Sequence, residues 1–415
     1  MEEWKEYKLG EIFDFNNGLS KGGKFFGHGY DFVSFKTVFK NHFLPNTLDD
    51  LVESSKKERE KFSVKEGDVF LTRTSETQNE LAYSCVALKD YPNATYNGFT
   101  KRLRPNGKIK IDSIFSAYFF RSAIFRNQVT SMSNMVTRAS LSNEMLDRMS
   151  IKIPSYDLQK TIGKILFSFD AKIQLNKRIN DNLEQQAQAL FKSWFVDFEP
   201  FKDGKFVESE LGMIPEGCRV GKAEDFYNIN IGKTPPRKEQ IWFSSNSSDY
   251  TWISISDLGS CGRFVFTSSE FLTHEAIKRH NIILVPKDTI LLSFKFTIGR
   301  VGIAGTELTT NEAIARFITS DENREYTYFL LKGYNYEKLG STSSIATAVN
   351  SKIIKAMVVL MPDKEILKAF SSLTKPYFDQ ILRNEQESIR LTILRDTLLP
   401  KLMSGELKIN TTEVL

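Results

Sequence analysis

The chain repeats itself, because residues 141–196 and residues 349–404 follow the same order of features. In each copy a hydrophobic strand leads through a proline into a long, charge-balanced helix. The proline is Pro154 in the first copy and Pro362 in the second, 208 positions later. A repeat constrains the fold more than any other pattern, since both copies must form the same structural unit. The sequence therefore predicts two similar globular units that alternate with two similar long helices.

The repeat extends into the segments that precede the helices. Insertions between the halves fall at loops, while the order of the elements is kept. The matched residues are Trp4, Phe13, Phe15, Gly18 and Ser20 with Cys218, Tyr227, Ile229, Gly232 and Thr234 at an offset of 214; Tyr30, Ser34 and Asp68 with Tyr250, Ser254 and Asp288 at 220; and Asn97 and Arg102 with Asn311 and Arg316 at 214.

Each globular unit has the composition of a mixed α/β domain. In the first, strand-like segments precede an amphipathic helix that begins after Asp112, a good N-cap residue. The second repeats this order and ends in a helix expected over residues 323–338. The predicted strands are 31–38, 68–72, 82–88 and 99–103 in the first unit, and 252–255, 289–294, 300–304 and 315–318 in the second. We expect globular domains at 1–154 and 202–362, a central helix at 155–201, and a distal helix with the C-terminal tail at 363–415.

The first long helix begins after Pro154, with Ser155 or Asp157 as its N-cap, and carries apolar residues at alternating spacings of four and three. This heptad spacing is typical of a coiled coil. The first seam is Ile162, Leu166, Phe169, Ile173, Asn176, Asn180, Leu183, Ala187, Leu190 and Trp194. The second is Leu367, Phe370, Tyr377, Ile381, Leu391, Leu398 and Leu402, interrupted at Thr374, Asn384, Ser388 and Arg395, and Pro400 should bend its last turn. Two antiparallel helices, related by an approximate twofold axis, are expected to hold the globular units apart.

Asn176 and Asn180 are polar residues within the first seam. Polar residues at such positions lower stability but fix the register and orientation of paired helices. The alternative interpretation is that both side chains face solvent where the helices splay apart. The sequence leaves both interpretations open.

The positive charge of the chain lies in its globular segments. The formal net charge is +5, while each long helical segment carries equal numbers of acidic and basic residues. A basic excess on the globular units favours an anionic partner such as nucleic acid. From charge alone, an ordinary surface of mixed charge is an equally good interpretation.

Several classes of protein are disfavoured by missing patterns. The three cysteines are widely separated and the four histidines form no ligand set, so we expect neither disulfides nor a metal site. No run of about 18 apolar residues indicates a membrane span, and the N-terminus has no apolar leader, so we expect a cytoplasmic protein.

No catalytic motif is complete. The segment from Gly18 to Phe25 approaches the phosphate-binding pattern G-x-x-x-x-G-K-[ST], but Phe25 lacks the hydroxyl group, and two glycines that follow oppose the required helix. The adenine methyltransferase motif Asn/Asp-Pro-Pro-aromatic is missing, and no serine lies in a nucleophile-elbow pattern. We therefore expect a non-catalytic binding protein that needs no cofactor.

Longer motifs resemble the specificity subunit of type I restriction-modification enzymes. QALFKSWFVDFEPF at 188–201, followed by ELGMIPEG at 210–217, resembles the central conserved region of that family. LLPKLMSGEL at 398–407 resembles its distal conserved region, and shorter matches are WKxxKLGEI at 4–12, GKTP at 232–235 and GRVG at 299–302. Cys218 departs from the family pattern, which usually has tryptophan at this position. The matches span nearly the whole chain.

The resemblance implies a non-catalytic, DNA-reading subunit of an adenine-specific DNA methyltransferase and endonuclease complex. Each globular unit would be a target recognition domain that reads one half of a split, asymmetric sequence in double-stranded DNA. The antiparallel helices would set the spacer and dock two methyltransferase subunits, and two motor-nuclease (restriction) subunits would complete the complex. Half-sites one turn apart are separated by about 34 Å, which a rod of about 55 to 60 Å can span.

The residues expected at the DNA are Lys, Arg and hydroxyl donors on loops, because these bind phosphates and base edges. They are Lys21, Lys24, Lys36, Arg73, Thr74, Lys101 and Arg138 in the first unit, and Lys233, Arg237, Lys238, Lys295, Arg300 and Ser343 in the second. Arg73 and Lys295 are the strongest pair, because each follows the strand that contains Asp68 or Asp288. Arg102 and Arg316 are expected to be scaffold, since the two domains should read different sequences.

Three alternatives stay open. A specificity subunit of a related system with fused methylation and cleavage would have no separate methyltransferase and motor genes beside it. A protein-binding coiled-coil adaptor would show no salt-dependent affinity for DNA. A nuclease or methyltransferase in one chain is disfavoured by the missing motifs.

Overall fold

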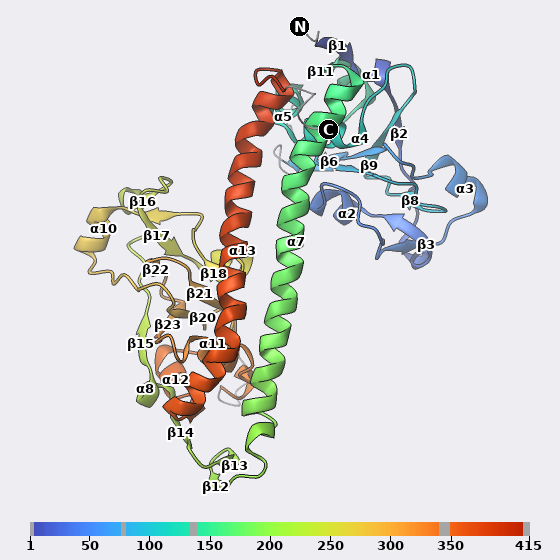
Figure 1. The fold of residues 1–415 in the computed structure, drawn as a ribbon. Helices are drawn as coiled ribbons and strands as arrows, with labels where there is room; N and C mark the ends of the chain where they lie inside the picture. Colours follow the sequence, from blue (N-terminus) through green and yellow to red (C-terminus); the bar gives the residue numbers. More distant parts are fainter. Residues whose placement is uncertain (1–3, 76–79, 133–138, 340–348, 410–415) are drawn as a thin grey trace. The chain divides into compact units, whose positions relative to one another are not determined.

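The computed structural model describes residues 4–75, 80–132, 139–339 and 349–409 (Figure 1). The chain divides into two compact units: unit 1 is Met1–Ile173 with Arg390–Leu415, and unit 2 is Gln174–Ile389. Two long helices, α7 (Tyr156–Phe195) and α13 (Lys364–Ser404), contribute to both units. Each unit therefore contains one globular part and one portion of each long helix.

Unit 1 is built around a four-stranded antiparallel sheet in the order β2 (Phe13–Asn17), β9 (Thr100–Pro105), β5 (Val69–Thr72), β7 (Ser84–Val86). A smaller sheet has the order β4 (Leu51–Val52), β3 (Phe26–Val33), β8 (Thr95–Tyr96). Two further pairs are β1 (Lys5–Lys8) with β11 (Ser150–Ile153), and β6 (Thr74–Ser75) with β10 (Ala139–Ser140). The shorter helices are α1 (Leu9–Ile12), α2 (Phe35–Lys40), α3 (Lys56–Lys61), α4 (Ser113–Arg121), α5 (Ala123–Met132) and α6 (Asn143–Arg148).

Unit 2 repeats this plan with a five-stranded sheet in the order β15 (Asn228–Ile231), β23 (Ile314–Ile318), β20 (Ile290–Ser293), β21 (Val301–Ala304), β18 (Phe264–Val265). Its second sheet has the order β16 (Phe243–Ser244), β19 (Phe271–Leu272), β17 (Tyr250–Ile253), β22 (Thr309–Thr310). Two further pairs are β12 (Phe206–Ser209) with β13 (Gly212–Pro215), and β14 (Cys218–Lys222) with β24 (Val358–Pro362). The shorter helices are α8 (Ala223–Phe226), α9 (Ile255–Ser260), α10 (His274–Arg279), α11 (Arg324–Lys332) and α12 (Ser351–Lys355).

The central strands place side chains on two cores. Val69 and Leu71 of β5 pack in the larger core of unit 1, where α4, α5 and both long helices meet the sheet, while Phe70 packs in the smaller core on the opposite face. In unit 2, Ile290 and Leu292 of β20 likewise belong to the larger core and Leu291 to a smaller one. Alternation along a strand explains this division, and it accounts for the continuous apolar run of each strand.

The duplication extends to individual hydrogen bonds. The Leu9 N–H donates to the Met149 carbonyl at 3.0 Å in unit 1, and the Ala223 N–H donates to the Met357 carbonyl at 2.8 Å in unit 2. Ser34 and Ser254 are the N-caps of α2 and α9, and each side chain accepts from a backbone N–H in the first turn. The predicted offsets of 214, 208 and 220 are therefore confirmed at these positions.

One predicted match is shifted by a residue. The N–H groups of Gly67 and Asp288 donate to equivalent carbonyls, those of Ala87 and Ala304, and both residues have positive φ, 84° and 71°. Asp288 therefore takes the place of Gly67, so its match with Asp68 is wrong. The offset along this strand is 221, so Arg73 corresponds to Phe294. Lys295 lies beyond the end of the strand, in a connection that is shorter than that of unit 1.

Two other predicted elements differ from the structure. The strand predicted at 31–38 ends at Val33, because the Ser34 hydroxyl accepts from the Thr37 N–H at 3.2 Å and begins α2. The helix predicted at 323–338 ends at Lys332, and Tyr336–Lys338 forms a separate 3-10 turn. The remaining predicted strands agree with the structure to within two residues at each end.

The long helices contact each other within each unit. In unit 2, Asn180 contacts Asn384, and Phe195, further along α7, contacts Phe370, earlier in α13; the two portions therefore run antiparallel. In unit 1, Asp170 forms an ion pair with Arg395. The predicted seam residues are all buried or half-buried, Ser155 is the N-cap of α7, and α13 continues as a helix through Pro400. Among the residues that the structure describes, no helix has the length and hydropathy needed to cross a membrane.

The two seam asparagines are buried, with exposures of 0% for Asn176 and 2% for Asn180. Asn384 donates its side-chain amide to the Asn180 Oδ1 at 2.8 Å, and Asn176 donates its own to the Ser388 hydroxyl at 3.3 Å. The offset of 208 relates the two bonds, so this contact has local twofold symmetry. The interpretation that these asparagines face solvent is wrong, while their role in fixing register stays a prediction.

A buried carboxylate ties the globular part of unit 2 to α7. Glu184 accepts from the Tyr328 hydroxyl at 2.6 Å and from the Arg263 Nε at 2.8 Å, and it forms an ion pair with Lys332. Burial alone would raise the pKa of Glu184, but the hydrogen bonds from Lys332 and Tyr328 and the attraction of Arg263 lower it below its usual value.

Candidate nucleic-acid interface

The same edge of the main sheet is built from the same turns in both units. In unit 1, a Cβ atom on Gly18 would collide with the backbone of Asn97, and in unit 2 a Cβ atom on Gly232 would collide with Asn311. Asn97 and Asn311 each accept a backbone N–H two residues further on, at 2.7 and 3.1 Å. The Asn97 edge is the surface formed by Asn97, the end of β5 and the start of β9 in unit 1. The Asn311 edge is the surface formed by Asn311, the end of β20 and the start of β23 in unit 2.

Two cations lie close together on the Asn97 edge. The Arg73 N–H donates to the Phe99 carbonyl at 2.9 Å, and its Nε is buried without a hydrogen-bond partner. Lys101 donates to the side-chain carbonyls of Asn17, at 3.2 Å, and Asn143. Burial and the neighbouring charge of Arg73 lower the pKa of Lys101. The hydrogen-bond acceptors of Lys101 are neutral amides, and the nearby Glu144 carboxylate offsets part of the positive charge of Lys101 and Arg73.

Lys101 itself is only 3% exposed. Its ammonium group is held by the two asparagines, so the side chain as it stands has little surface for the predicted DNA contact, which stays a prediction. A sequence pattern does not reveal this, because Asn17 and Asn143 are remote from Lys101 along the chain.

The Asn311 edge carries three of the predicted residues. The Lys233 N–H donates to the Thr310 carbonyl at 2.9 Å, and its ammonium group donates to the His280 carbonyl at 2.6 Å. Lys295 and Arg300 flank the turn between β20 and β21. The guanidinium group of Arg300 donates to the Ile255 carbonyl at 2.8 Å, while the Lys295 ammonium lies 5.8 Å from the centre of the Phe294 ring.

Other predicted cations are held by internal interactions. The Lys21 side chain is 15% exposed and donates to Glu58 at 2.8 Å; this bond, with the Ser55 backbone N–H, lowers the pKa of Glu58 to about 2. Arg237 pairs with Glu270 at 2.8 Å and lies over the rings of Phe243 and Trp252.

The remaining predicted residues divide into three groups. Lys24, Lys36 and Lys238 are exposed, and Thr74 is half-buried in β6. Arg138 and Ser343 lie outside the described residues.

Arg102 and Arg316 are buried at equivalent strand positions. Arg102 donates to the Ser63 carbonyl at 2.7 Å, and Arg316 donates to the carbonyls of Ile283 and Ile231 at 2.9 and 2.8 Å. Burial lowers the pKa of Arg316 to about 10. Both side chains cross-link loops to the sheet, as expected of scaffold residues.

Two exposed aromatic side chains on these edges were not predicted. Phe99 is 63% exposed on the Asn97 edge, and Phe296, in the turn after β20, is 97% exposed. The signal that could have found them is the comparison of the repeats, because Phe99 corresponds to Ala313, and the segment 73–82 of the first copy has no aromatic residue to match Phe296.

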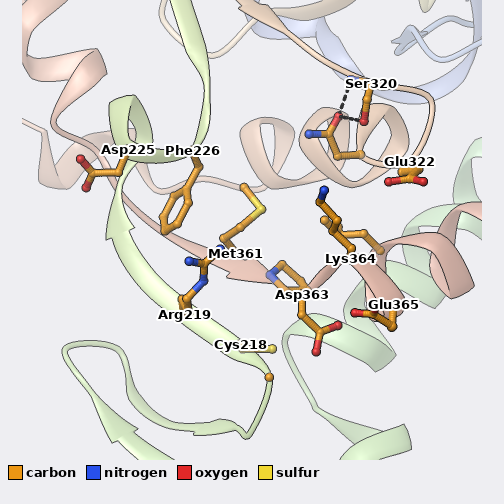
Figure 2. A pocket seen from close by; sticks show the side chains of 14 residues that line it. Cys218, Arg219, Asp225, Phe226, Ser320, Glu322, Met361, Asp363, Lys364 and Glu365 are labelled. Carbon is orange, nitrogen blue, oxygen red and sulfur yellow. Dashed lines mark hydrogen bonds between the residues drawn. The ribbon is translucent and has the colours of Figure 1, made fainter.

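A hollow of about 620 Å³ lies at β14 and the start of α13 in unit 2. Figure 2 shows the side chains that line it. Asp225 accepts from the Lys222 N–H at 2.9 Å and Asp363 from the Ile366 N–H at 2.9 Å, so both carboxylates cap helices. Burial and the nearby Asp363 raise the pKa of the Cys218 thiol to about 11. A thiol of this kind stays protonated at neutral pH and is a poor nucleophile.

The segment from Gly18 to Phe25 does not have the surroundings of a phosphate-binding loop. Gly23–Phe25 forms a 3-10 turn that leads into strand β3, where the phosphate-binding motif requires a helix.

Two copies of one mixed α/β fold, two long helices and a polar edge on each copy define a class of internally duplicated proteins. Residues 1–185 and 215–391 match the family described as the type I restriction modification DNA specificity domain. This chain therefore belongs to the family of specificity subunits of type I restriction-modification systems.

Individual relatives agree with this family. The HindI specificity subunit of Haemophilus influenzae is 25% identical to this chain. The alignment covers 98% of this chain and 100% of that protein. The MjaIX specificity subunit of Methanocaldococcus jannaschii is 29% identical over 335 residues, which are 78% of this chain and 75% of that protein. The crystal structure of a type I S subunit from M. genitalium matches with a TM-score of 0.56 and 13% identity, over 97% of this chain and 96% of that one, which shows the shared fold.

Proposed function

We propose that this chain recognises a bipartite, asymmetric target in double-stranded DNA, with one globular part reading each half. It acts as the non-catalytic specificity subunit of a complex that contains two methyltransferase subunits and, in the restriction enzyme, two motor-nuclease subunits. In this proposal residues 1–154 and 202–362 are the target recognition domains, and 155–201 and 363–415 form a coiled-coil spacer. The chain itself binds no cofactor or metal and works in the cytoplasm, where the DNA is.

The proposal rests on one observation: the two copies share the residues that support the fold but differ in the residues exposed on the Asn97 and Asn311 edges. The two copies keep Gly18 and Gly232, Asn97 and Asn311, and Arg102 and Arg316 in equivalent places. The edges supported by this scaffold differ, since Arg73 corresponds to Phe294 and Phe99 to Ala313. One scaffold with two different surfaces suits a protein that reads two different half-sites.

The helices suit the proposed roles as spacer and docking surface. Helix α7 has 40 residues, which corresponds to about 60 Å. Exposed apolar residues lie on these helices and favour contact with another protein; they are Leu175, Ile179 and Ile389 in unit 2, and Ile393 and Leu394 in unit 1. Unit 2 also has an apolar groove of about 680 Å³ beside α7, lined by Phe195, Val196 and Leu211 among others. These surfaces support docking of the methyltransferase subunits.

Genome-wide mapping of methyladenine in the host, with and without this gene, tests the proposal. We expect one split motif to lose its methylation when the gene is removed. The same complex should lose affinity for DNA steeply as salt is raised, because phosphate contacts release counterions. If the chain were a protein-binding adaptor, removal of the gene would leave methylation unchanged, and no salt-dependent affinity for DNA would be found. Separate methyltransferase and motor genes beside this one distinguish a type I enzyme from a system with fused activities.

Replacing Arg73 with alanine should weaken binding by the assembled methyltransferase at the first half-site only. A bidentate contact to a base is worth about 1–3 kcal/mol, and Arg73 combines a side chain on the edge with an unpartnered Nε. Lys295→Ala should act at the second half-site only. Titration against duplexes in which one half-site is scrambled separates the two effects.

Lys202→Ala is the matched control, since this exposed lysine pairs with Glu199 at 2.5 Å in the segment after α7. It should leave both half-sites unchanged. Unaltered affinity in both the Arg73 and Lys295 variants would remove these residues from the interface.

A further inference from the structure

Phe296 is held in a conformation that the folded chain alone does not favour. Its ring is 97% exposed, and its backbone has φ of +59°, a region that L-residues with bulky side chains rarely adopt. Exposure forgoes the burial that stabilises aromatic residues, and the positive φ adds backbone strain. Two unfavourable features at one residue point to a role outside the folded chain.

The turn around Phe296 is closed by hydrogen bonds centred on Ser293. The Ser293 hydroxyl donates to the Thr297 carbonyl at 2.6 Å, and the Gly299 N–H donates to the Ser293 carbonyl at 3.0 Å. The Thr297 N–H donates to the Lys295 carbonyl at 2.7 Å. These bonds fix the backbone on both sides of Phe296, so the turn presents the ring to solvent.

The repeat shows which side chains the fold itself needs. Phe99 corresponds to Ala313 in the second copy, and the first copy has no aromatic residue in the segment 73–82, which takes the place of the turn that carries Phe296. Each copy therefore forms the fold without the aromatic residue that the other copy carries, so the scaffold requires neither ring. Yet both rings lie on the equivalent edge, at the ends of the central strands, but on different turns.

Cationic groups accompany both rings. Arg73 is hydrogen-bonded through its backbone to Phe99, and Lys295 and Arg300 flank the turn that carries Phe296. Phosphates pair with the cations, and the flat faces of bases stack on aromatic rings. An apolar side chain that enters a base step partly unstacks it and bends the duplex.

We propose that Phe296 is a wedge that inserts into a base step of the second half-site, and that Phe99 does the same in the first. This inference rests on the proposed function and adds the way in which each half-site is deformed. Because the two rings arise from different turns, each wedge enters at a different place relative to its domain. Bases at that step are selected by how readily they unstack as well as by direct contact.

The test uses the complete methyltransferase complex and the target found by methyladenine mapping. Phe296→Gly removes the ring and also suits the positive φ, so the variant should be at least as stable as the natural protein to heat. We expect its affinity for the target to fall by about 5- to 150-fold, the equivalent of losing one stacked base. Phe296→Trp keeps a stacking surface and should retain most of the affinity.

A fluorescent base analogue, 2-aminopurine, placed at successive positions of each half-site reports unstacking. The natural complex should raise its fluorescence at one step of the second half-site, and Phe296→Gly should abolish that signal while leaving the first half-site unchanged. Phe99→Ala should give the reverse pattern. Met213→Ala is the matched control, because this residue of β13 is 56% exposed and apolar but belongs to a different hairpin.

The outcomes separate the wedge from the proposed function. If the Phe296→Gly complex binds and unstacks DNA like the natural one, the wedge is rejected while DNA recognition stands. If the variant fails to assemble with the methyltransferase but its own DNA binding is unchanged, the ring contacts protein and the wedge is again rejected. If the natural complex has no salt-dependent DNA affinity, the proposed function itself fails.

Discussion

Replacing Glu184 with alanine should lower the free energy of unfolding of unit 2 by about 3–5 kcal/mol, the usual effect of removing one partner from a buried ion pair. The carboxylate accepts from Tyr328 and Arg263 and pairs with Lys332. Its removal leaves the buried Tyr328 hydroxyl without its acceptor, takes from Arg263 one of its two carboxylate partners, the other being Asp181, and leaves Lys332 without its ion-pair partner. These contacts join α11 and the loop before β18 to α7. Urea denaturation followed by tryptophan fluorescence measures the change.

The effect of Glu184→Ala should depend on pH. Because folding lowers the pKa of Glu184 below 4.5, its ionised form stabilises the native state above about pH 4.5. This contribution is lost as the pH falls through the folded pKa, so the difference between the variant and the natural protein should shrink in acid. Glu199→Ala, which removes the surface pair with Lys202, should change stability by less than about 0.5 kcal/mol at any pH. A Glu184 variant as stable as this control would show that the network contributes little.

Inserting four residues into both long helices should change the spacer of the DNA target and neither half-site. The insertions belong between Ile173 and Gln174 and between Ile389 and Arg390, where the two units meet along the chain. Contacts within each unit, including Asn176 with Ser388 and Asp170 with Arg395, are then left intact. Four residues lengthen a helix by about 6 Å, or about two base pairs. Methyladenine mapping should show the same half-sites at a greater separation.

The matched variant carries the insertion in α7 alone. The two helices then differ in length, so their facing residues cannot stay aligned in both units, and we expect methylation to be lost. A second control places four residues after Gly204, in a loop that follows α7, and should leave the target unchanged. If the paired insertion altered a half-site at the old spacing, the helices would not be the spacer.

The duplicated architecture was predictable because both copies keep residues whose roles are local. Ser34 and Ser254 cap helices, and Gly18 and Gly232 allow a close backbone approach, so each forms the same contact in its own copy. The heptad spacing also identified the inward residues of the long helices. The one shifted match, Asp68 with Asp288, arose because identical residue types suggested equivalence. Asp288 is instead equivalent to Gly67, because both residues have a positive φ, and residue identity does not reveal this.

The candidate interface was less predictable, because exposure and partners depend on tertiary contacts. Lys21 and Lys101 have the residue type and loop position of DNA contacts. In the structure Glu58 holds the first, and Asn17 and Asn143 enclose the second. Phe296 shows the opposite case, because phenylalanine is commonly buried but this residue lies almost fully in solvent. Comparison of the two copies helps here, because residues kept in both copies support the fold, whereas a residue present in one copy alone is not required for it.

The reciprocal bonds of Asn176 with Ser388 and of Asn180 with Asn384 bear on the ancestry of the chain. A contact in which each side presents the same surface is the kind that two identical subunits form when they dimerise. Half of this chain already contains both faces of that contact, so an ancestral gene of half the length had the means to assemble with itself. Such a homodimer would read one sequence twice, as a palindrome. Fusion of two gene copies would free each edge to diverge and would give the asymmetric target of the proposed function.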